Sequence, residues 1–402
     1  MAKIAVIGAG IAGCAAALFL QRQGHEVSIF EAQAAMDRIN GAGLLLQPAG
    51  MAVLKQLEIL SPVLMNGARI NALFGTTLQQ RLVLNLQYNQ LHPDYHGLGI
   101  ERHYLFKLLQ QQVTSDAITI HWQVHIQGIK QREHTVILTD EYQQQYIDFD
   151  GVIVANGRRS NIHQTCDIWR KIIPYPWGAL WAICPELTET TQQKQLRQVY
   201  DGTRKMLGIL PVGIGNEINN KVSFFWSLPN NQLTNWQQQP LQQWKDEVLK
   251  LYPALNKMLD TINDHKQLSF ASYNDIYMKD FHKHRIVFIG DAAHSMSPQL
   301  GQGANLALID AALLANHLCQ ENDIPTAYAN YNRQRKQAIK YYQRLSRMMT
   351  PIFQSYYPGL NVVRDQCFHP LSKIPFVNHL MLATLACVKP SLWRSTEVVI
   401  KP

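Results

Sequence analysis

The sequence predicts an α/β fold with a Rossmann-like dinucleotide-binding domain, an inserted β-sheet region and helices at the C-terminal end. Three observations lead to this prediction. The chain opens with a glycine-rich turn between a strand and a helix, and a second strand–turn–helix unit lies at residues 285–318. Strand-like runs rich in tryptophan and phenylalanine lie between the two units. A chain of 402 residues is long enough for two or three domains.

The first strand–turn–helix unit has the pattern of a dinucleotide-binding site. Residues 4–7 are all apolar, as expected of a buried parallel strand. Residues 11–23 predict a helix that ends at Gly24, and residues 27–30 predict a second strand closed by Glu31. Because strand, glycines, helix, strand and acid follow in this order, the unit is far more specific than an isolated glycine motif.

The turn itself reads G-x-G-x-x-G, with glycines at positions 8, 10 and 13. We expect Gly8 to allow the tight turn, Gly10 to let the backbone approach a pyrophosphate, and Gly13 to let helix and strand pack closely. The helix N-terminus then offers free N–H groups to the phosphates, and Glu31 can accept hydrogen bonds from an adenosine ribose. Ile11, Ala12 and Ala32 complete this part of the predicted site.

The second unit predicts a contact with a flat, electron-poor ring. A strand over residues 286–289 ends at Gly290-Asp291, and a helix is expected over residues 304–318. Asp291 is placed to bind polyol hydroxyls, and the glycines at 301 and 303, after Pro298, leave room for a planar group. A helix N-terminus stabilises negative charge by about 0.3–2 kcal/mol, which suits a flavin ring that becomes anionic on reduction. Ala304 and Asn305 belong to this predicted site.

On these motifs the sequence resembles the FAD-dependent monooxygenases of the para-hydroxybenzoate hydroxylase type, the single-component aromatic hydroxylases. The glycine motif at 8–13 matches, as does Gly290-Asp291 with Ala292, Ala293, His294 and Pro298 in the family's order. The family's third motif, Ala-Asp-Gly-x-x-Ser, reads Ala155-Asn156-Gly157-Arg158-Arg159-Ser160 here. Asn156 therefore removes a charge from a segment that in the family touches both FAD and the nicotinamide cofactor.

The resemblance also implies further cofactor contacts. Arg38 matches an arginine that reaches FAD ahead of the strand containing Gly43, Arg102 matches one directed at the pyrophosphate, and Val124 lies where the backbone meets adenine. His294 in the family packs and hydrogen-bonds beneath the flavin more often than it acts in catalysis. The sequence identifies no catalytic base and no metal site.

The function implied is hydroxylation or epoxidation of a small aromatic or polycyclic substrate by O2, with FAD reduced by NADPH or NADH and a flavin C4a-hydroperoxide as oxidant. Three alternatives remain: a flavin oxidoreductase without oxygen insertion, a flavin-dependent halogenase, and a flavin-binding regulator. The halogenase motif W-x-W-x-I-P fits poorly, because Trp177 and Trp181 are four residues apart and Cys184 precedes Pro185.

The expected domains are discontinuous. Residues 1–70, 96–167 and 271–350 would form the FAD-binding domain, 71–95 and 168–270 the substrate domain, and 351–402 a C-terminal helical segment broken by prolines 351, 358, 370 and 375. An amphipathic helix is expected within residues 241–255. The aromatic strands, with Trp177, Ala179 and Trp181 on one face and Val222, Phe224 and Trp226 together on another strand, either line a substrate pocket or form ordinary sheet core.

Composition limits the partners. With 47% hydrophobic and 16% charged residues the chain is globular. The net charge of +8 comes without a dense Lys/Arg run, so we expect a scattered positive surface and no nucleic-acid partner. Six cysteines without a C-x-x-C pair indicate reduced thiols in the cytoplasm. No signal peptide is expected, and the apolar stretch 375–388 is too short for a transmembrane segment. The protein is expected to be a monomer or homodimer.

Overall fold

The computed structural model describes residues 1–34, 42–186, 194–214 and 220–389. Its first layer is a six-stranded sheet with the order β18-β19-β12-β1-β2-β8, in which only β18 is antiparallel to its neighbour. The strands are β1 (Lys3–Ile7), β2 (Glu26–Glu31), β8 (Thr119–Trp122), β12 (Gly151–Val154), β18 (His282–Lys283) and β19 (Ile286–Phe288). This is the predicted Rossmann-like sheet: its strands are parallel except for β18, and parallel sheets are covered by helices on both faces, which suits the apolar strands β1, β12 and β19.

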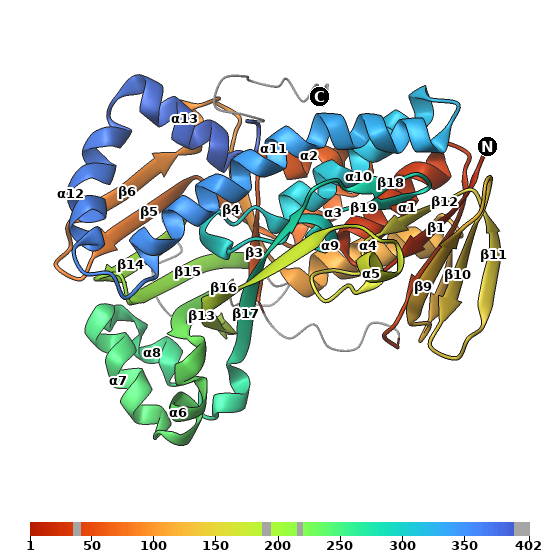
Figure 1. Ribbon diagram of the computed structural model, residues 1–402. Helices are drawn as coiled ribbons and strands as arrows, with labels where there is room; N and C mark the ends of the chain where they lie inside the picture. The colour runs from red at the N-terminus through yellow and green to blue at the C-terminus, as the bar shows by residue number, and fades with distance from the viewer. Residues whose placement is uncertain (35–41, 187–193, 215–219, 390–402) are drawn as a thin grey trace.

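Helices and small sheets surround this layer. The helices are α1 (Ile11–Arg22), α2 (Pro48–Gln56), α3 (Leu60–Met65), α4 (Arg102–Ser115), α5 (Ile162–Thr165), α9 (Asp291–His294) and α10 (Gly303–Gln320). A sheet of β9 (Ile126–Gln131), β10 (Val136–Asp140) and β11 (Gln145–Phe149) lies at one end of the molecule (Figure 1). The helices predicted after the first and second glycine turns are α1 and α10, so both strand–turn–helix predictions are confirmed.

A seven-stranded sheet with the order β17-β13-β16-β15-β14-β5-β6 forms the second layer. Its strands are β5 (Ala72–Thr77), β6 (Leu82–Gln87), β13 (Arg170–Pro185), β14 (Gln195–Asp201), β15 (Lys205–Ile214), β16 (Asn220–Pro229) and β17 (Ser269–Met278). The domain boundary expected between residues 270 and 271 therefore falls inside β17. A three-stranded sheet of β3 (Gly43–Leu46), β7 (Gly97–Glu101) and β4 (Ala68–Ile70) contacts β15 of the seven-stranded sheet.

The two faces of the seven-stranded sheet have different partners. Val222, Phe224 and Trp226 on β16 are buried in one cluster with Trp244 of α7. The helices on this side are α6 (Leu233–Gln238), α7 (Leu241–Leu251) and α8 (Asn256–Leu259). These aromatic residues are therefore ordinary sheet core. Ala179 and Trp181 on β13 belong to a separate cluster with residues of β6, β15 and the C-terminal helices.

The amphipathic helix expected within residues 241–255 is α7, which ends at Leu251 because Pro253 disfavours helical conformation at the residue before it. The C-terminal helices are α11 (Ile324–Phe353), α12 (Leu360–Ser372) and α13 (Pro375–Leu385). The prediction that four prolines break this region was wrong for two of them, because Pro351 lies inside α11 and Pro370 inside α12. Both occupy the last turn, where burial of Phe353 and Ser372 holds the chain helical despite the missing N–H. In the part of the chain that the structure describes, no helix is long and apolar enough to cross a membrane.

Candidate cofactor and active site

The glycines in the turn between β1 and α1 have two different roles. Gly8 has φ +104°, and a Cβ there would lie 2.7 Å from the carbonyl oxygen of Ala155. A Cβ on Gly13 would lie 1.9 Å from the carbonyl oxygen of Gly8. A Cβ on Gly10 would meet no heavy atom within 4 Å. The protein's own packing therefore requires glycine at positions 8 and 13, as predicted, whereas Gly10 borders open space.

The first turn of α1 is free to receive an anion. Among the described residues no side chain caps the helix, and no acidic residue lies in the first turn, which begins at Ile11 and Ala12. The N–H groups of such a turn have no partner within the helix, and the helix dipole adds positive potential there. Together with the open space beside Gly10, this arrangement suits a pyrophosphate.

Glu31 connects the glycine turn to the next two strands. Its Oε2 accepts a hydrogen bond from the N–H of Ala9 at 2.7 Å, and its Oε1 accepts one from Gln33 at 3.0 Å. The backbone N–H of Val124 donates to the Glu31 carbonyl oxygen at 2.9 Å, and Ala32 is exposed beside it. Each carboxylate oxygen keeps lone pairs for further donors, so Glu31 remains able to bind ribose hydroxyls.

The Gly-Asp turn places a carboxylate beside a second glycine pair. Gly290 has φ +58°, and a Cβ there would lie 3.0 Å from the Cβ of Ala12, so the turn packs against α1. Asp291 is exposed in the first turn of α9. A Cβ on Gly303 would meet only Asp291 Oδ1, at 3.8 Å, and one on Gly301 would meet nothing within 4 Å. Among the described residues, the backbone after the short helical turn Pro298–Leu300 is thus uncrowded, next to Ala304 at the start of α10.

Asn305 and Gly43 are engaged with the protein itself. Asn305 is fully buried, and its side chain accepts from the N–H of Gln47 at 2.8 Å and donates to the Leu45 carbonyl at 3.1 Å. The N–H of Gly43 donates to Ser223 Oγ at 2.9 Å, and a Cβ on Gly43 would lie 2.5 Å from Ser223 Cβ. These two residues fix β3 against α10 and the seven-stranded sheet.

His294 is directed into the protein interior. Its Nε2 lies 2.5 Å from Oδ2 of Asp310, which also accepts from the N–H of Gly290 at 2.9 Å. Arg335 Nε lies 2.5 Å from the other oxygen, Asp310 Oδ1. Burial acts to raise the pKa of Asp310, but the charges of His294 and Arg335 and their hydrogen bonds hold the pKa at about 2. Because the carboxylate is ionised, His294 Nε2 is the donor.

This cluster positions the Gly-Asp turn, since Asp310 holds both Gly290 and His294. The role in packing expected for His294 therefore fits its contacts better than a catalytic role. Asp310 and Arg335 were not among the predicted site residues. The available signal was a charged residue within the apolar run LALIDAALLA, because a buried carboxylate requires a partner.

The third motif lies against the first. The Cα of Asn156 would be 2.7 Å from a Cβ on Gly8, and Asn156 Oδ1 is buried without a hydrogen-bond partner among the described residues. Two arginines hold the loop: Arg158 donates to the carbonyl of Ser272 on β17, and Arg170 donates to the carbonyls of Ser160 and Arg158. Arg170, which no sequence pattern singled out, thus ties the loop to the seven-stranded sheet.

Tyr273 and Trp181 form a polar pair on that sheet. Trp181 Nε1 donates to the Tyr273 hydroxyl at 2.9 Å. Burial raises the pKa of Tyr273 to about 12, although the hydrogen bond from Trp181 and the charges of Arg158 and Arg102 act in the opposite direction. The phenol therefore stays protonated near neutral pH and keeps its own proton to donate. Arg102 is exposed at the start of α4, and its N–H donates to the Ala42 carbonyl at 3.0 Å. Arg38 lies outside the described residues.

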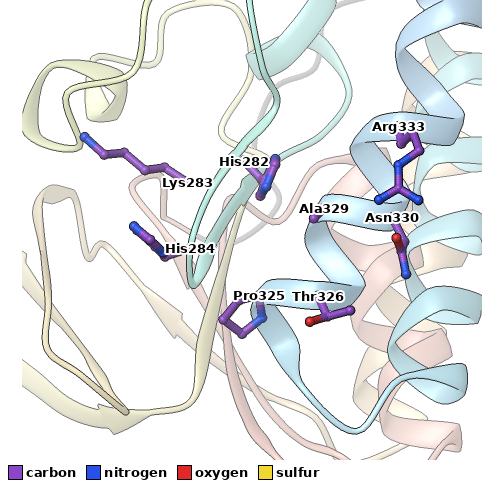
Figure 2. Close-up of a pocket in the computed structure, with 8 residues that line it drawn as sticks. All are labelled: His282, Lys283, His284, Pro325, Thr326, Ala329, Asn330 and Arg333. Carbon is purple, nitrogen blue, oxygen red and sulfur yellow. The ribbon is translucent and has the colours of Figure 1, made fainter.

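A hollow of about 560 Å³ lies between the β18–β19 hairpin and the start of α11. Figure 2 shows that Lys283 and His284 point away from α11. Lys283 Nζ is paired with Asp167 Oδ2 at 3.0 Å. Because these basic side chains do not converge, the hollow is not a candidate active site.

Comparison with known proteins identifies the family. Residues 1–344 match the family model described as FAD binding domain. The chain belongs to this family of FAD-dependent monooxygenases. It is 24% identical over 324 residues to 6-methylpretetramide 4-monooxygenase of Streptomyces rimosus, covering 79% of this chain and 75% of that protein. It is 23% identical to the putative FAD-dependent monooxygenase YetM of Bacillus subtilis (strain 168), covering 92% of this chain and 98% of YetM.

The fold of this FAD-dependent monooxygenase is also that of solved flavoproteins. Klebsiella pneumoniae HpxO, solved with FAD and uric acid, superposes with a TM-score of 0.81 at 19% identity, over 96% of this chain and 97% of HpxO. The predicted family, fold class and cofactor are confirmed. The alternatives of a flavin oxidoreductase without oxygen insertion, a halogenase and a non-enzymatic flavin protein are not favoured.

The monooxygenase carries asparagine where the family's third motif has aspartate, and this leads to a first prediction. Asn156→Asp is expected to change the rate of flavin reduction by about tenfold while changing FAD affinity less. The new carboxylate would act on charge that develops roughly 10 Å away during flavin reduction. At an effective dielectric constant near 20 the interaction energy is about 1.5 kcal/mol, which corresponds to about tenfold in rate. Anaerobic stopped-flow reduction with NADPH and NADH, beside FAD titration, measures both quantities. Equal reduction rates for the two proteins would contradict the prediction.

Proposed function

We propose that this protein hydroxylates a small aromatic or polycyclic substrate, using O2 and either NADPH or NADH. The observation that supports this most directly is the meeting of three motifs around open space. Gly10, Gly301 and Gly303 have no backbone or apolar neighbour where a side chain would extend, whereas Gly8 and Gly13 are packed tightly. Gly157 of the third motif borders open space as well, but so do Gly24, Gly202 and Gly359 outside the motifs. The support therefore comes from where Gly10 and Gly303 lie, beside the N-termini of α1 and α10.

The residues present fit FAD. In the proposed site, the N-terminus of α1, with Gly10, Ile11 and Ala12, holds the pyrophosphate. Glu31 holds the adenosine ribose, and Asp291 holds the ribityl hydroxyls. The N-terminus of α10, with Gly303 and Ala304, would stabilise negative charge on the ring. Further residues either contact FAD in the proposed site or hold the backbone around it in place. They are Arg102, Val124, Ala32, Pro298 and Asn305.

When bound, the flavin supplies hydride acceptance and oxygen activation, and the chain's own residues orient the reactants and exclude water. The Trp181–Tyr273 pair lies on the sheet expected to face the substrate, and the protonated Tyr273 hydroxyl offers a donor for a substrate oxygen or carboxylate. Gln47 offers another, because its Nε2 is buried without a partner among the described residues while its Oε1 accepts from Tyr88 at 2.6 Å. No residue is assigned as catalytic base.

Oxygen isotope incorporation tests the proposed reaction. The purified protein is incubated with NADPH or NADH and a panel of phenols, quinolones and polycyclic aromatics under oxygen-18, and product masses are followed. Substrate-stimulated consumption of NADPH or NADH together with a labelled product is the expected result. Hydride transfer without label in any product would support a flavin oxidoreductase instead.

The nature of the flavin gives a second prediction. The protein is expected to purify yellow and to release FAD, not FMN, because the glycine turn and Glu31 bind the adenosine half that FMN lacks. Chromatography of the flavin released by heat measures this. Release of FMN alone would refute the proposed site.

We also propose a cellular compartment, an assembly and domain boundaries. The six cysteines are free thiols, which supports the cytoplasm as compartment. A monomer or homodimer is the proposed assembly. The FAD-binding parts are proposed to be residues 1–70, 96–167 and 279–350, with the boundary after β17 and not within it, since β17 pairs along its length with β13.

A further inference from the structure

The net positive charge of the chain arises from one region. Residues 324–389 contain nine Lys/Arg and one acidic residue, Asp365. Nine minus one equals the net charge of +8 of the whole chain, so the remaining residues carry equal numbers of both signs. Six of the nine lie on α11, and two of the nine, Arg335 and Arg364, are buried. Such asymmetry along a chain indicates an anionic partner.

Helix α12 in this region has an inverted pattern of burial. Arg364 is fully buried, with Nη2 2.7 Å from Asp365 Oδ1, and its guanidinium lies 4.5 Å from the ring centroid of Tyr200. Val363 and Leu371, in contrast, are 50% and 43% exposed. Positions 363, 367 and 371 follow a helical spacing and are all exposed, so they form one outward stripe of α12. Ile374, also exposed, follows just after the helix ends at Ser372, whereas Phe368 packs inward against a buried cluster.

This stripe is part of a larger surface, which we call the C-terminal apolar face. It consists of seven exposed large hydrophobic residues within a stretch of 21: Tyr356, Tyr357, Val362, Val363, Leu371, Ile374 and Phe376. Fifteen such residues are exposed in the described chain, so about half lie here. Phe376, at the start of α13, is 71% exposed. Figure 1 shows α12 and α13 together at the end of the molecule opposite β9, β10 and β11.

Basic side chains surround the C-terminal apolar face. The Arg204 guanidinium lies 5.6 Å from the ring centroid of Tyr356. Arg81 lines the same surface depression as Val362, and Lys373 is exposed between Leu371 and Ile374 in the chain. Asp365, the acidic residue nearest in sequence, is already paired with Arg364. The face thus combines aromatic and aliphatic residues with a basic rim of Arg81, Arg204 and Lys373.

We propose that the C-terminal apolar face binds peripherally to an anionic lipid surface. Aromatic residues partition into the headgroup region of a bilayer, and each Lys or Arg near anionic lipid adds attraction. A second copy of the chain fits less well. In a two-fold interface each residue occurs twice, so the basic rim would be brought against itself without a matching acidic surface. Lipid binding would let the protein meet apolar substrates at a membrane, and it does not depend on the proposed reaction.

Sedimentation with vesicles tests the proposal on the intact protein. Vesicles of phosphatidylcholine alone are compared with mixed vesicles containing phosphatidylglycerol. The protein is expected to sediment with the mixed vesicles, and less so when salt rises from about 0.1 M to about 1 M, because the Debye length falls from about 10 Å to about 3 Å.

Single substitutions test whether vesicle binding depends on the C-terminal apolar face or on nonspecific adsorption. Phe376→Glu and Val363→Glu are each expected to weaken binding to mixed vesicles about tenfold or more, the effect of losing one buried large apolar side chain. Lys373→Glu should weaken binding to mixed vesicles and leave any binding to neutral vesicles unchanged. Ile147→Glu is the matched control, since Ile147 is 51% exposed on β11, at the other end of the molecule. Bound flavin and circular dichroism verify the fold of each variant.

Three results would overturn the proposal. The first is a parent protein that stays in the supernatant with both kinds of vesicle. The second is a loss of binding in Ile147→Glu as large as in Phe376→Glu. The third is a parent protein that is a dimer, becomes a monomer in Phe376→Glu, and binds vesicles in neither form. That result would assign the face to self-association. Substrate turnover is measured separately, so failure of the reaction and failure of lipid binding are distinguishable.

Discussion

Asp310→Ala is expected to lower the free energy of unfolding by about 3–5 kcal/mol, the usual effect of removing one partner from a buried ionic cluster. Asp310 is fully buried, and it accepts hydrogen bonds from Gly290, His294 and Arg335. Its removal leaves the Arg335 guanidinium buried without its counter-charge. The Gly-Asp turn also loses the bond that holds the Gly290 N–H.

Urea unfolding of the parent and the variant measures the effect. Asp246→Ala is the control, because Asp246 is exposed on α7 and, within the described part of the chain, its side chain bonds Gln242 alone, at 2.8 Å. That change should cost less than about 0.5 kcal/mol. Similar unfolding midpoints for Asp310→Ala and Asp246→Ala would show that the cluster does not stabilise the fold.

The pH dependence of the same cluster follows from the lowered pKa of Asp310. A carboxyl group with a folded-state pKa of about 2 binds its proton less readily than in the unfolded chain, where the pKa is about 3.9. The ionised form therefore contributes stability that is fully present above about pH 4 and lost as pH falls towards about 2. The stability difference between the parent and Asp310→Asn should shrink across this window. A difference that stays constant down to pH 2 would contradict the assigned pKa.

Local patterns in the sequence predicted the nucleotide-binding units because their determinants are close together in the chain. Gly8 and Gly13 are five residues apart, and their conformational demands are visible from strand, turn and helix alone. Glu31 was placed correctly beside the turn, since it ends the adjacent parallel strand and bonds Ala9. Such features require no knowledge of the tertiary fold.

Contacts between distant segments were not predictable in this way. The bond between Gln47 and Asn305 joins residues 258 positions apart, and Arg158 reaches Ser272 across 114. The alternation of residues in β16 shows which side chains share a face of the strand, but not which elements pack against each face. Only the structure shows that Trp226 packs towards Trp244 and not towards a pocket. A period of two fixes which residues share a face, whereas the neighbouring layer decides what that face does.

Asp291→Ala is expected to weaken FAD binding about 10- to 150-fold, because a hydrogen bond to a charged group contributes about 1.5–3 kcal/mol and each 1.4 kcal/mol changes affinity tenfold. The fold should remain intact. Asp291 is exposed, and its Oδ1 lies 3.8 Å from the position of a Cβ on Gly303, so it borders the space proposed for the ribityl chain without supporting the core. Asp246→Ala again serves as the control for loss of an exposed carboxylate.

Gly303→Val should weaken FAD more than Asp291→Ala does. A Cβ at position 303 finds room, but the two methyl groups of valine would extend further into the space beside Asp291, where the flat ring is proposed to lie. Titration of the apoproteins with FAD, followed by flavin fluorescence, measures both affinities once circular dichroism has shown native spectra. If Asp291→Ala binds FAD as tightly as the parent, the Gly-Asp turn has a packing role through Gly290 and Asp310. The ribityl contacts must then come from other residues along the first turn of α10.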